Sequence, residues 1–183
     1  MASIDLLRAV HHPTRRRLLD YLYVNGASQV GTLATHLDQQ VGSISHHLRM
    51  LERAGVVERA PELATDGRTS WWRAVTTTIS WAVDDFADQP AQMMEARAAQ
   101  RLTYEHQFRR LAEWRKRSED AGQEWRGAAF SADGLSRATS AELEELSRLF
   151  AEAFDTWAAS IDRDDGQERE PIFWFAHGFP VQP

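Results

Sequence analysis

The stretch Val41-Gly-Ser-Ile-Ser-His-His-Leu-Arg-Met-Leu-Glu-Arg-Ala-Gly55 decides the fold of this chain. Ile44, Leu48 and Leu51 are spaced at i, i+4 and i+7, so the stretch predicts a helix that buries one apolar face. The opposite face carries short hydrogen-bonding groups and cations, namely Ser43, Ser45, His46, Arg49 and Arg53. Such side chains on one rigid helix are suited to reading base edges in a DNA groove. An ordinary amphipathic helix with a solvated polar face is the alternative interpretation.

The residues before this helix predict two more helices. Pro13 suits the first turn of a helix, and Asn25-Gly26 ends it. Ser28 is a candidate N-cap for a helix whose apolar residues run from Val30 to Leu37. Because only a few residues separate Leu37 from Val41, the pattern indicates a helix-turn-helix whose second helix enters the major groove.

The residues after the helix predict a β-hairpin. Residues 56–60 and 70–75 have strand composition, and Asp66-Gly67 between them is a turn dipeptide. A hairpin directly after a DNA-reading helix is a wing, and its tip would place Arg68 against a phosphate or in a minor groove. A solvated turn cation is the alternative interpretation for Arg68.

Three motifs, in order, resemble those of the ArsR-type winged-helix transcriptional regulators. The segment His12-Pro-Thr-Arg-Arg-Arg-Leu-Leu19 is similar to the family's opening signature, residues 45–57 to its recognition helix, and residues 67–74 to its wing. The resemblance covers residues 4–76. It implies repression rather than activation, and it implies DNA contacts from Ser43, Ser45 and His46, with Gln40 just before the helix.

Composition limits the protein's class. The 183 residues include no cysteine, which excludes disulfides and thiolate metal sites. No apolar run approaches the roughly 18 residues of a membrane span, and no signal peptide pattern is evident, so we expect a cytoplasmic protein without membrane partners.

The net charge of −6 is unevenly distributed. Residues 1–78 hold nine arginines against seven acids, a net charge of +2, and residues 79–183 carry −8. For binding to phosphate groups, the local electrostatic field of the domain matters more than the net charge of the whole chain.

The second half of the chain predicts a long helix. Ile79, Val83 and Phe86 begin a helical stripe, Pro90 should kink or restart it, and helical spacing continues to about Ser118. A winged-helix core cannot bury so long a stripe, so pairing with a second copy is favoured. Packing on the chain's own C-terminal residues is the alternative.

The last 60 or so residues predict a mixed region. Residues 125–130 and 135–138 resemble strands around Asp133-Gly134, Thr139-Ser-Ala-Glu142 is a capping box before an amphipathic helix, and residues 171–177 resemble a strand. The predicted fold class is therefore mainly α with a β-wing. Its domains are a winged helix-turn-helix domain (1–78), a helical dimerisation segment (79–120), and a small α+β region that is a candidate effector-binding region (121–183).

The sequence contains none of the common signatures of catalysis or metal binding. It contains no nucleophile elbow, phosphate-binding glycine loop or zinc-protease signature, so we expect neither an enzyme nor a cofactor. Asp84 and His106 are more than five helical turns apart and cannot share an ion within one helix, so we expect no metal site. The C-terminal tryptophans are either core and interface residues or the lining of an aromatic pocket for a small-molecule effector; they are Trp81, Trp114, Trp125, Trp157 and Trp174.

Together these features predict a homodimeric regulator, by resemblance a repressor, that binds a palindromic operator in double-stranded DNA. The expected groove readers are Ser43, Ser45, His46 and Arg49, and the expected phosphate contacts are Gln40, Arg15 and Arg68. The alternative hypothesis is a protein-interaction module that uses the winged helix and the acidic, tryptophan-rich C-terminal region.

Overall fold

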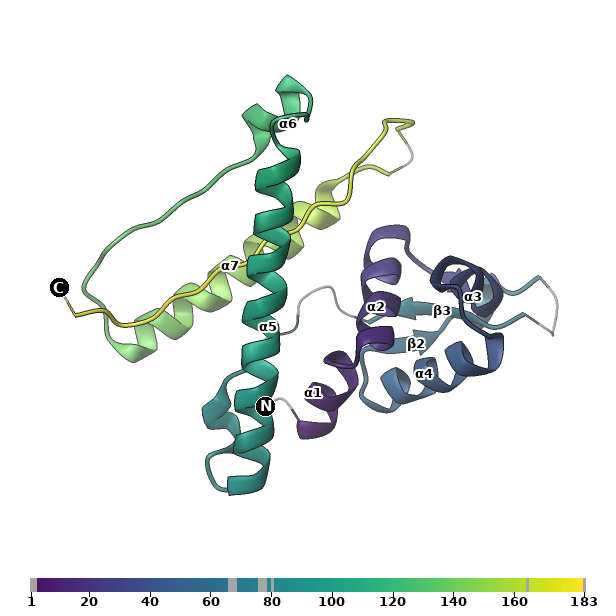
Figure 1. The fold of residues 1–183 in the computed structure, drawn as a ribbon, viewed down its shortest axis with the longest axis horizontal. Coiled ribbons are helices and arrows are strands. Elements are labelled where there is room, and N and C mark those ends of the chain that lie inside the picture. The colour runs from purple at the N-terminus through teal and green to yellow at the C-terminus, as the bar shows by residue number, and fades with distance from the viewer. Residues whose placement is uncertain (1–2, 66–68, 76–78, 80, 164, 183) are drawn as a thin grey trace. The chain divides into compact units, whose positions relative to one another are not determined.

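The computed structural model describes residues 3–65, 69–75, 79, 81–163 and 165–182. The chain forms two compact units, residues 1–105 and 106–183, and the boundary lies within its longest helix (Figure 1). Unit 1 contains α1 (Ile4–Val10), α2 (Pro13–Asn25), β1 (Ser28–Gln29), α3 (Val30–Leu37), α4 (Val41–Arg53), β2 (Val57–Arg59), η1 (Pro61–Leu63), β3 (Trp71–Ala74), η2 (Val83–Phe86) and the first part of α5 (Pro90–Arg117). The rest of α5, α6 (Gln123–Ala128) and α7 (Ser140–Ser160) belong to unit 2.

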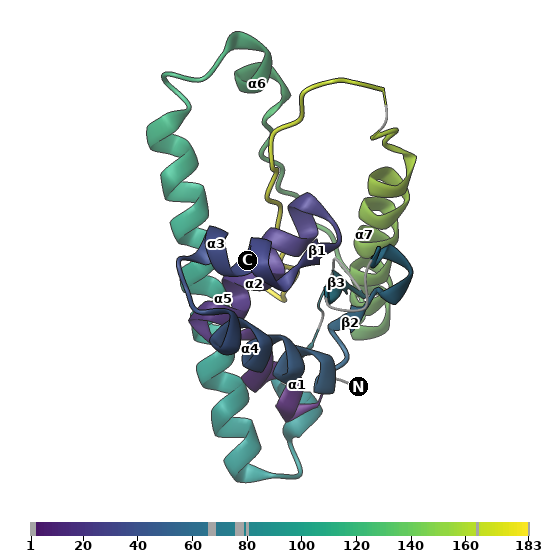
Figure 2. The ribbon, with the colours of Figure 1, turned by 90° about the vertical axis from the view of Figure 1, so that its right-hand side faces the viewer.

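The core of unit 1 is built around α4. Its three apolar side chains Ile44, Leu48 and Leu51 are 0% exposed. They meet residues of α1, α2, α3 and β2, the elements against which α4 packs (Figure 2). At about 25 cal/mol per Å² of buried apolar surface, three such side chains contribute several kcal/mol, which fixes α4 in its orientation.

Three short antiparallel strands close this core, in the order β1-β3-β2. In β3, Trp72 pairs with Ser28 on one side and with Arg59 on the other, and its indole is buried. The predicted hairpin of β2 and β3 is confirmed, and so is the mainly α fold with a small sheet. Arg68, which the sequence predicts at the tip of this hairpin, lies outside the described residues.

Helix boundaries in unit 1 follow the local signals closely. Pro13 begins α2, and Gly26, at φ +72°, follows its last residue. Ser28 does not cap α3, contrary to expectation, because it lies in β1 and pairs with β3. Helix α1 and strand β1 were not predicted.

The first part of α5 packs on α1 within unit 1. Ala96 and Ala99 of α5 form a small buried cluster with Leu7 and Phe86. Above it, Arg8 donates from Nε and Nη2 to the two carboxylate oxygens of Glu95, at 2.7 and 2.9 Å. Phe86, one of the residues expected to need a partner, is therefore covered by the chain itself, whereas Met94 and Leu102 of α5 are 72% and 49% exposed.

Pro90 restarts the helix, as predicted, but the residues before it are not a helix. The described residues Ile79, Trp81 and Ala82 are irregular, and only the short 3-10 turn Val83–Phe86 follows them. Pro90 cannot donate a backbone hydrogen bond, so it suits the first turn of α5 and not the interior of a longer helix.

Unit 2 consists of the second part of α5, α6, α7 and an extended tail, residues 171–182, which Figure 2 shows between α5 and α7. The capping box that begins α7 is confirmed: the Glu142 amide donates to Thr139 Oγ1, and the Thr139 amide donates to a Glu142 carboxylate oxygen. Alternate tail residues contact the two helices. Phe173 and Phe175 meet the rings of His106 and Phe108 on α5, and Trp174 lies 4.8 Å from Phe154 on α7.

The strands predicted for the C-terminal region are wrong. Residues 125–130 overlap α6, whose Glu124 and Arg126 complement the helix dipole, so the turn at Asp133-Gly134 has no strand to pair with. Residues 171–177 are extended and alternate in side-chain direction, but no neighbouring strand offers them a hydrogen-bonding ladder among the described residues. The described part of residues 121–183 is therefore helical and extended chain rather than α+β.

Candidate nucleic-acid interface

A tight turn sets the geometry of the two helices α3 and α4. Asp38 adopts the left-handed conformation at φ 54°, and its amide donates to the carbonyls of Ala34 and Thr35. The amide of Gln39 also donates to the Ala34 carbonyl, at 3.0 Å. These bonds satisfy the last carbonyls of α3 and reverse the chain within three residues, so that α4 starts at Val41.

The N-terminal end of α4 presents polar groups at the surface. Gln40 occupies the N-cap position but its side chain makes no capping hydrogen bond, and both Gln40 and Ser43 are exposed. The Ser43 hydroxyl donates to Gln39 Oε1 at 3.3 Å. The first amides of a helix attract phosphate groups when no side chain occupies them. This end of α4 can therefore accept an anion and present hydroxyl groups beside it.

The outer face of α4 is polar along its length. His46 and Arg49 are exposed, and Ser45 is half-buried. Within the part of the chain that the structure describes, Arg49 and Arg53 make no ion pair, so both keep their donors for a ligand. The predicted groove readers Ser43, Ser45, His46 and Arg49 thus all lie on the one helix whose other face is fixed in the core.

Three consecutive arginines of α2 have different roles, which the sequence did not separate. Arg15 donates from Nε to the carbonyl of Ala9 and from Nη2 to that of Arg8, both at 2.7 Å. It thereby holds the C-terminal end of α1, and none of the described residues accepts a hydrogen bond from its Nη1. Arg16 pairs with Asp20, whereas Arg17 is exposed without an ion pair to any described residue. Arg17 is therefore a further candidate for a phosphate contact.

Two histidine rings join the start of α2 to α4. His12 caps α2 by accepting the Thr14 amide hydrogen at Nδ1, so that nitrogen is unprotonated. The ring of His47 lies 4.8 Å from that of His12 and 5.6 Å from that of His46. Burial, with the charge of Arg15, lowers the pKa of His12. Burial, with the charges of His12, Arg15 and His46, lowers the pKa of His47.

The described cations of the wing are already paired. Arg73 of β3 forms ion pairs with Glu58 and Glu62, and Arg59 of β2 lies over the Trp72 ring at 4.9 Å, with Glu52 at 3.6 Å. These pairs are exposed and weakly stabilising. They leave the wing strands with little free positive charge, so the expected contact of the wing with DNA depends on its tip.

The five predicted pocket tryptophans are distributed over both units. Trp81 lies in unit 1, with its ring edge-on to His11 at 6.1 Å. In unit 2, Trp157 and Trp174 both contact Phe154, whereas Trp114 lies under Arg117 and Trp125 is on α6. An effector pocket formed by these tryptophans stays a prediction.

No group of three or more histidine, aspartate or glutamate side chains that could hold a metal ion occurs among the described residues. None of the described helices is both long and apolar enough to cross a lipid bilayer.

Comparison with known proteins finds similarity in the region of the turn and its two helices. Residues 10–60 match the family of the helix-turn-helix domain. The transcriptional repressor SdpR of Bacillus subtilis is 40% identical over 53 residues, which are 29% of this chain and 58% of SdpR. The chain thus spans less than two thirds of the length of that relative.

Two solved structures resemble the chain at low overall similarity. HlyU from Vibrio cholerae is 27% identical, with 40% of this chain and 75% of HlyU covered, at a TM-score of 0.35. A possible transcriptional regulator for arsenical resistance is 28% identical, with 65% of this chain and 98% of that protein covered, also at a TM-score of 0.35.

Proposed function

We propose that this chain is a DNA-binding transcriptional regulator, and specifically a repressor, that acts on double-stranded DNA in the cytoplasm. The observation that carries the proposal is α4. Three of its apolar side chains are fully buried, while Ser43, His46 and Arg49 on its other face are exposed. A helix that cannot rotate and presents hydrogen-bonding groups after a tight turn fits the major groove. The helix-turn-helix match of residues 10–60 and the similarity to the repressor SdpR support the same function.

Each proposed contact follows from its place in the domain. Ser43, Ser45, His46 and Arg49 read base edges, since they share the outer face of α4. Gln40 at the helix N-terminus, Arg15 through its Nη1, and Arg68, which the sequence predicts at the wing tip, contact phosphates, which set the register. Two copies of the chain bind the half-sites of a palindrome about 34 Å apart. With about three phosphate contacts per copy, the logarithm of the binding constant should fall with the logarithm of salt concentration at a slope of roughly −5.

Fluorescence anisotropy with DNA from immediately upstream of the chain's own gene tests this proposal. The measurement is made at several salt concentrations with excess competitor DNA, and we expect competitor-resistant binding of two chains per site. If that DNA is not bound, selection of bound fragments from the whole genome should recover a common sequence. Recovery of no sequence by either route would refute the proposal.

Matched arginine variants test the assigned face. Arg49→Ala should weaken specific binding and reduce its sequence preference, because the guanidinium is expected at a base edge, where one good contact contributes about 1–3 kcal/mol of discrimination. Arg97→Ala on α5 is the control, since Arg97 is also exposed and without an ion pair to a described residue, and it should bind like the wild type. Equal binding by both variants would place the DNA contact elsewhere.

A protein-interaction module is the second candidate function, and the half-exposed apolar side chains of unit 2 favour it. It predicts a chain that selects no DNA sequence and binds a partner protein through residues 106–183. A small-molecule effector bound by the C-terminal tryptophans would be compatible with the first function. It should change the operator affinity and the tryptophan fluorescence together.

A further inference from the structure

Unit 2 lacks a buried core. None of its described residues is buried, although α5 and α7 both carry large apolar side chains. Six of these side chains, Phe108, Leu111, Leu146, Leu149, Phe150 and Trp157, are between 43% and 58% exposed. Isolated exposed apolar residues are ordinary, but two helices with continuous apolar stripes indicate surfaces that another body covers.

The tail covers one edge of each stripe and leaves the other edge open. On α7, Phe154 is half-buried against Trp174, while Leu149 and Phe150, one turn away, remain about half exposed. On α5, Phe108 meets Phe175 of the tail and is still 58% exposed. The aromatic residues of the tail therefore already occupy one side of each helix, and the open edges need a different partner.

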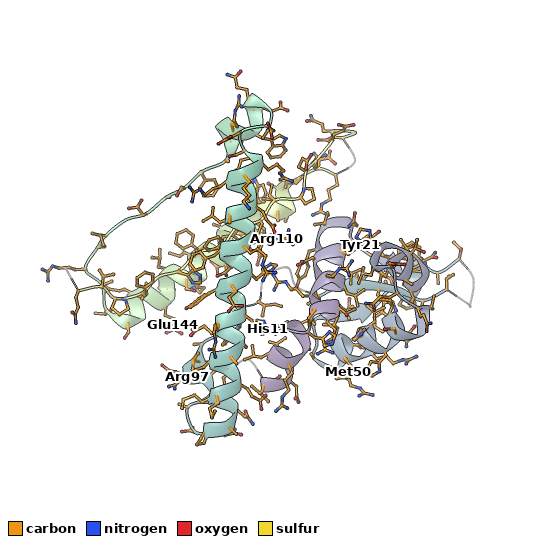
Figure 3. All side chains as sticks on the ribbon, viewed as in Figure 1. His11, Tyr21, Met50, Arg97, Arg110 and Glu144 are labelled. Carbon is orange, nitrogen blue, oxygen red and sulfur yellow. The ribbon has the colours of Figure 1, made fainter. Side chains whose placement is uncertain are left out.

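The two helices have opposite and matching charge. Residues 106–117 of α5 hold five cations and one carboxylate, and α7 holds five carboxylates and one cation. Arg115 lies at i+7 from Phe108 and i+4 from Leu111, so it shares their face of α5. Figure 3 marks Arg110 on α5 and Glu144 on α7, one from each set.

The acidic residues of α7 border its open apolar edge. Glu145 and Glu152 lie at i−4 and i+3 from Leu149, and both are more than half exposed although each pairs with Arg148. A basic, apolar α5 therefore complements an acidic, apolar α7. Every copy of the chain contains both helices. In a pair of copies, α5 of each copy can therefore meet α7 of the other copy.

We propose that α7 of one copy of this chain docks on the second part of α5 of a second copy, through Leu149 and Phe150 against Phe108 and Leu111. The contact forms twice about a two-fold axis, because the same two surfaces meet in both directions. Opposite charges at the rim favour this pairing over α5 on α5 or α7 on α7, in which like charges would face each other. The proposal rests on the homodimer proposed above and names the surface that forms it.

Analytical ultracentrifugation of the full chain over a range of concentrations tests the apolar part. Leu149→Asp should raise the dissociation constant of the dimer by at least tenfold, the order expected from loss of one buried leucine. Ser147→Asp adds the same charge on another face of α7 and should leave the dimer unchanged. A wild type that stays monomeric, or a Leu149→Asp chain that dimerises like the wild type, would overturn the proposal.

A second pair of variants tests the charge. Arg115→Glu should weaken the dimer by about tenfold, and Lys116→Glu, with the same change in net charge on the neighbouring face, should weaken it much less. Equal effects would mean that net charge, and not the α5 face, controls the association.

Cross-linking tests the pairing without adding a charge to the interface. The chain has no cysteine, so Phe108→Cys and Leu149→Cys each introduce the only thiol. Oxidation of a mixture of the two variants should give a covalent dimer that neither variant gives alone. A covalent dimer from Leu149→Cys alone would instead indicate α7 against α7 and overturn the proposed pairing.

DNA binding by the same variants separates the two proposals. If the mixture cross-links but the wild type selects no DNA, the dimer surface stands and the regulator function fails. If the wild type binds an operator as a dimer that Leu149→Asp does not weaken, the regulator stands and this surface fails.

Discussion

Helices α4 and α7 have the same kind of sequence and different surroundings. Each carries an apolar stripe at helical spacing, and each is a helix in the structure. In unit 1 the stripe of α4 is met from several sides by α1, α2, α3 and β2, and its leucines are 0% exposed. In unit 2 the stripe of α7 meets the extended tail at Phe154, and its Leu146 and Leu149 remain 45% and 48% exposed. Periodicity therefore predicts a helix and its apolar face, but not what covers that face.

The tryptophans show the same difference in burial between the two units. Trp72 in β3 is 2% exposed, because strands on both sides and the helices behind it enclose the indole. Trp157 on α7 is 46% exposed, although its ring lies 5.5 Å from that of Phe154. An aromatic side chain is thus enclosed within unit 1, whereas in unit 2 nearly half of its surface stays exposed.

The largest difference in stability between the two units is expected when one leucine is truncated in α4 and one in α7. Leu48→Ala should destabilise unit 1 by about 2–5 kcal/mol at any protein concentration, because it leaves a cavity in a closed core. Leu149→Ala should cost less than about 1 kcal/mol in dilute protein and more as the concentration rises, because its surface is buried only by a second copy. Urea unfolding followed by circular dichroism at two concentrations measures both. A large cost of Leu149→Ala that does not depend on concentration would mean that α7 is buried within one chain, and the comparison would fail.

Removal of an arginine tests whether unit 1 also uses its charges internally. Arg15→Ala should lower the free energy of unfolding by about 1–3 kcal/mol, because two carbonyls at the end of α1 lose a charged donor. Thermal unfolding measures this effect. Arg17→Ala in the same helix and Arg109→Ala in unit 2 are the controls, and neither should change the melting temperature. If Arg15→Ala also leaves it unchanged, Arg15 is a surface cation available entirely to phosphate.

Acid should weaken unit 1 through its histidines, by a smaller amount. The pKa values of His12 and His47 are lowered in the fold, so the neutral forms are favoured there. The stability that they contribute is complete above the unfolded pKa of about 6.5 and is lost as the pH falls below it. Melting temperatures of the wild type should therefore fall between pH 7 and pH 5.

The variant His12→Asn is the matched test of this pH dependence. Asparagine keeps a side-chain acceptor for the Thr14 amide and does not titrate, so the fall in melting temperature should become shallower. His12→Ala should be less stable by about 1 kcal/mol at neutral pH, through loss of the cap. An unchanged pH profile in His12→Asn would place the titrating group elsewhere.

Much of the candidate interface could be predicted because it follows from local rules. The spacing of Ile44, Leu48 and Leu51 fixes which face of α4 is buried, and the outward position of His46 and Arg49 follows from it. The sequence could not distinguish the roles of Arg15, Arg16 and Arg17, because three consecutive arginines look equivalent. Their roles differ because the structure places the carbonyls of α1 beside Arg15 and the carboxylate of Asp20 beside Arg16. The strands expected in unit 2 failed for a related reason, since a strand needs a neighbour and α6 formed where that neighbour was expected.

The sequence by itself determined the helix-turn-helix, the hairpin and the cap of α7, because each depends on residues within a few positions of one another: Pro13, Gly26, the stripe of α4, and the pair Thr139 and Glu142. The tertiary structure alone decided that Arg15 holds α1, that His12 meets His47, that Glu95 of α5 binds Arg8, and that the tail covers one edge of α5 and of α7. These are contacts between residues distant in the chain or between separate helices. Side-chain spacing along one helix does not specify them, because they depend on which elements the core brings together.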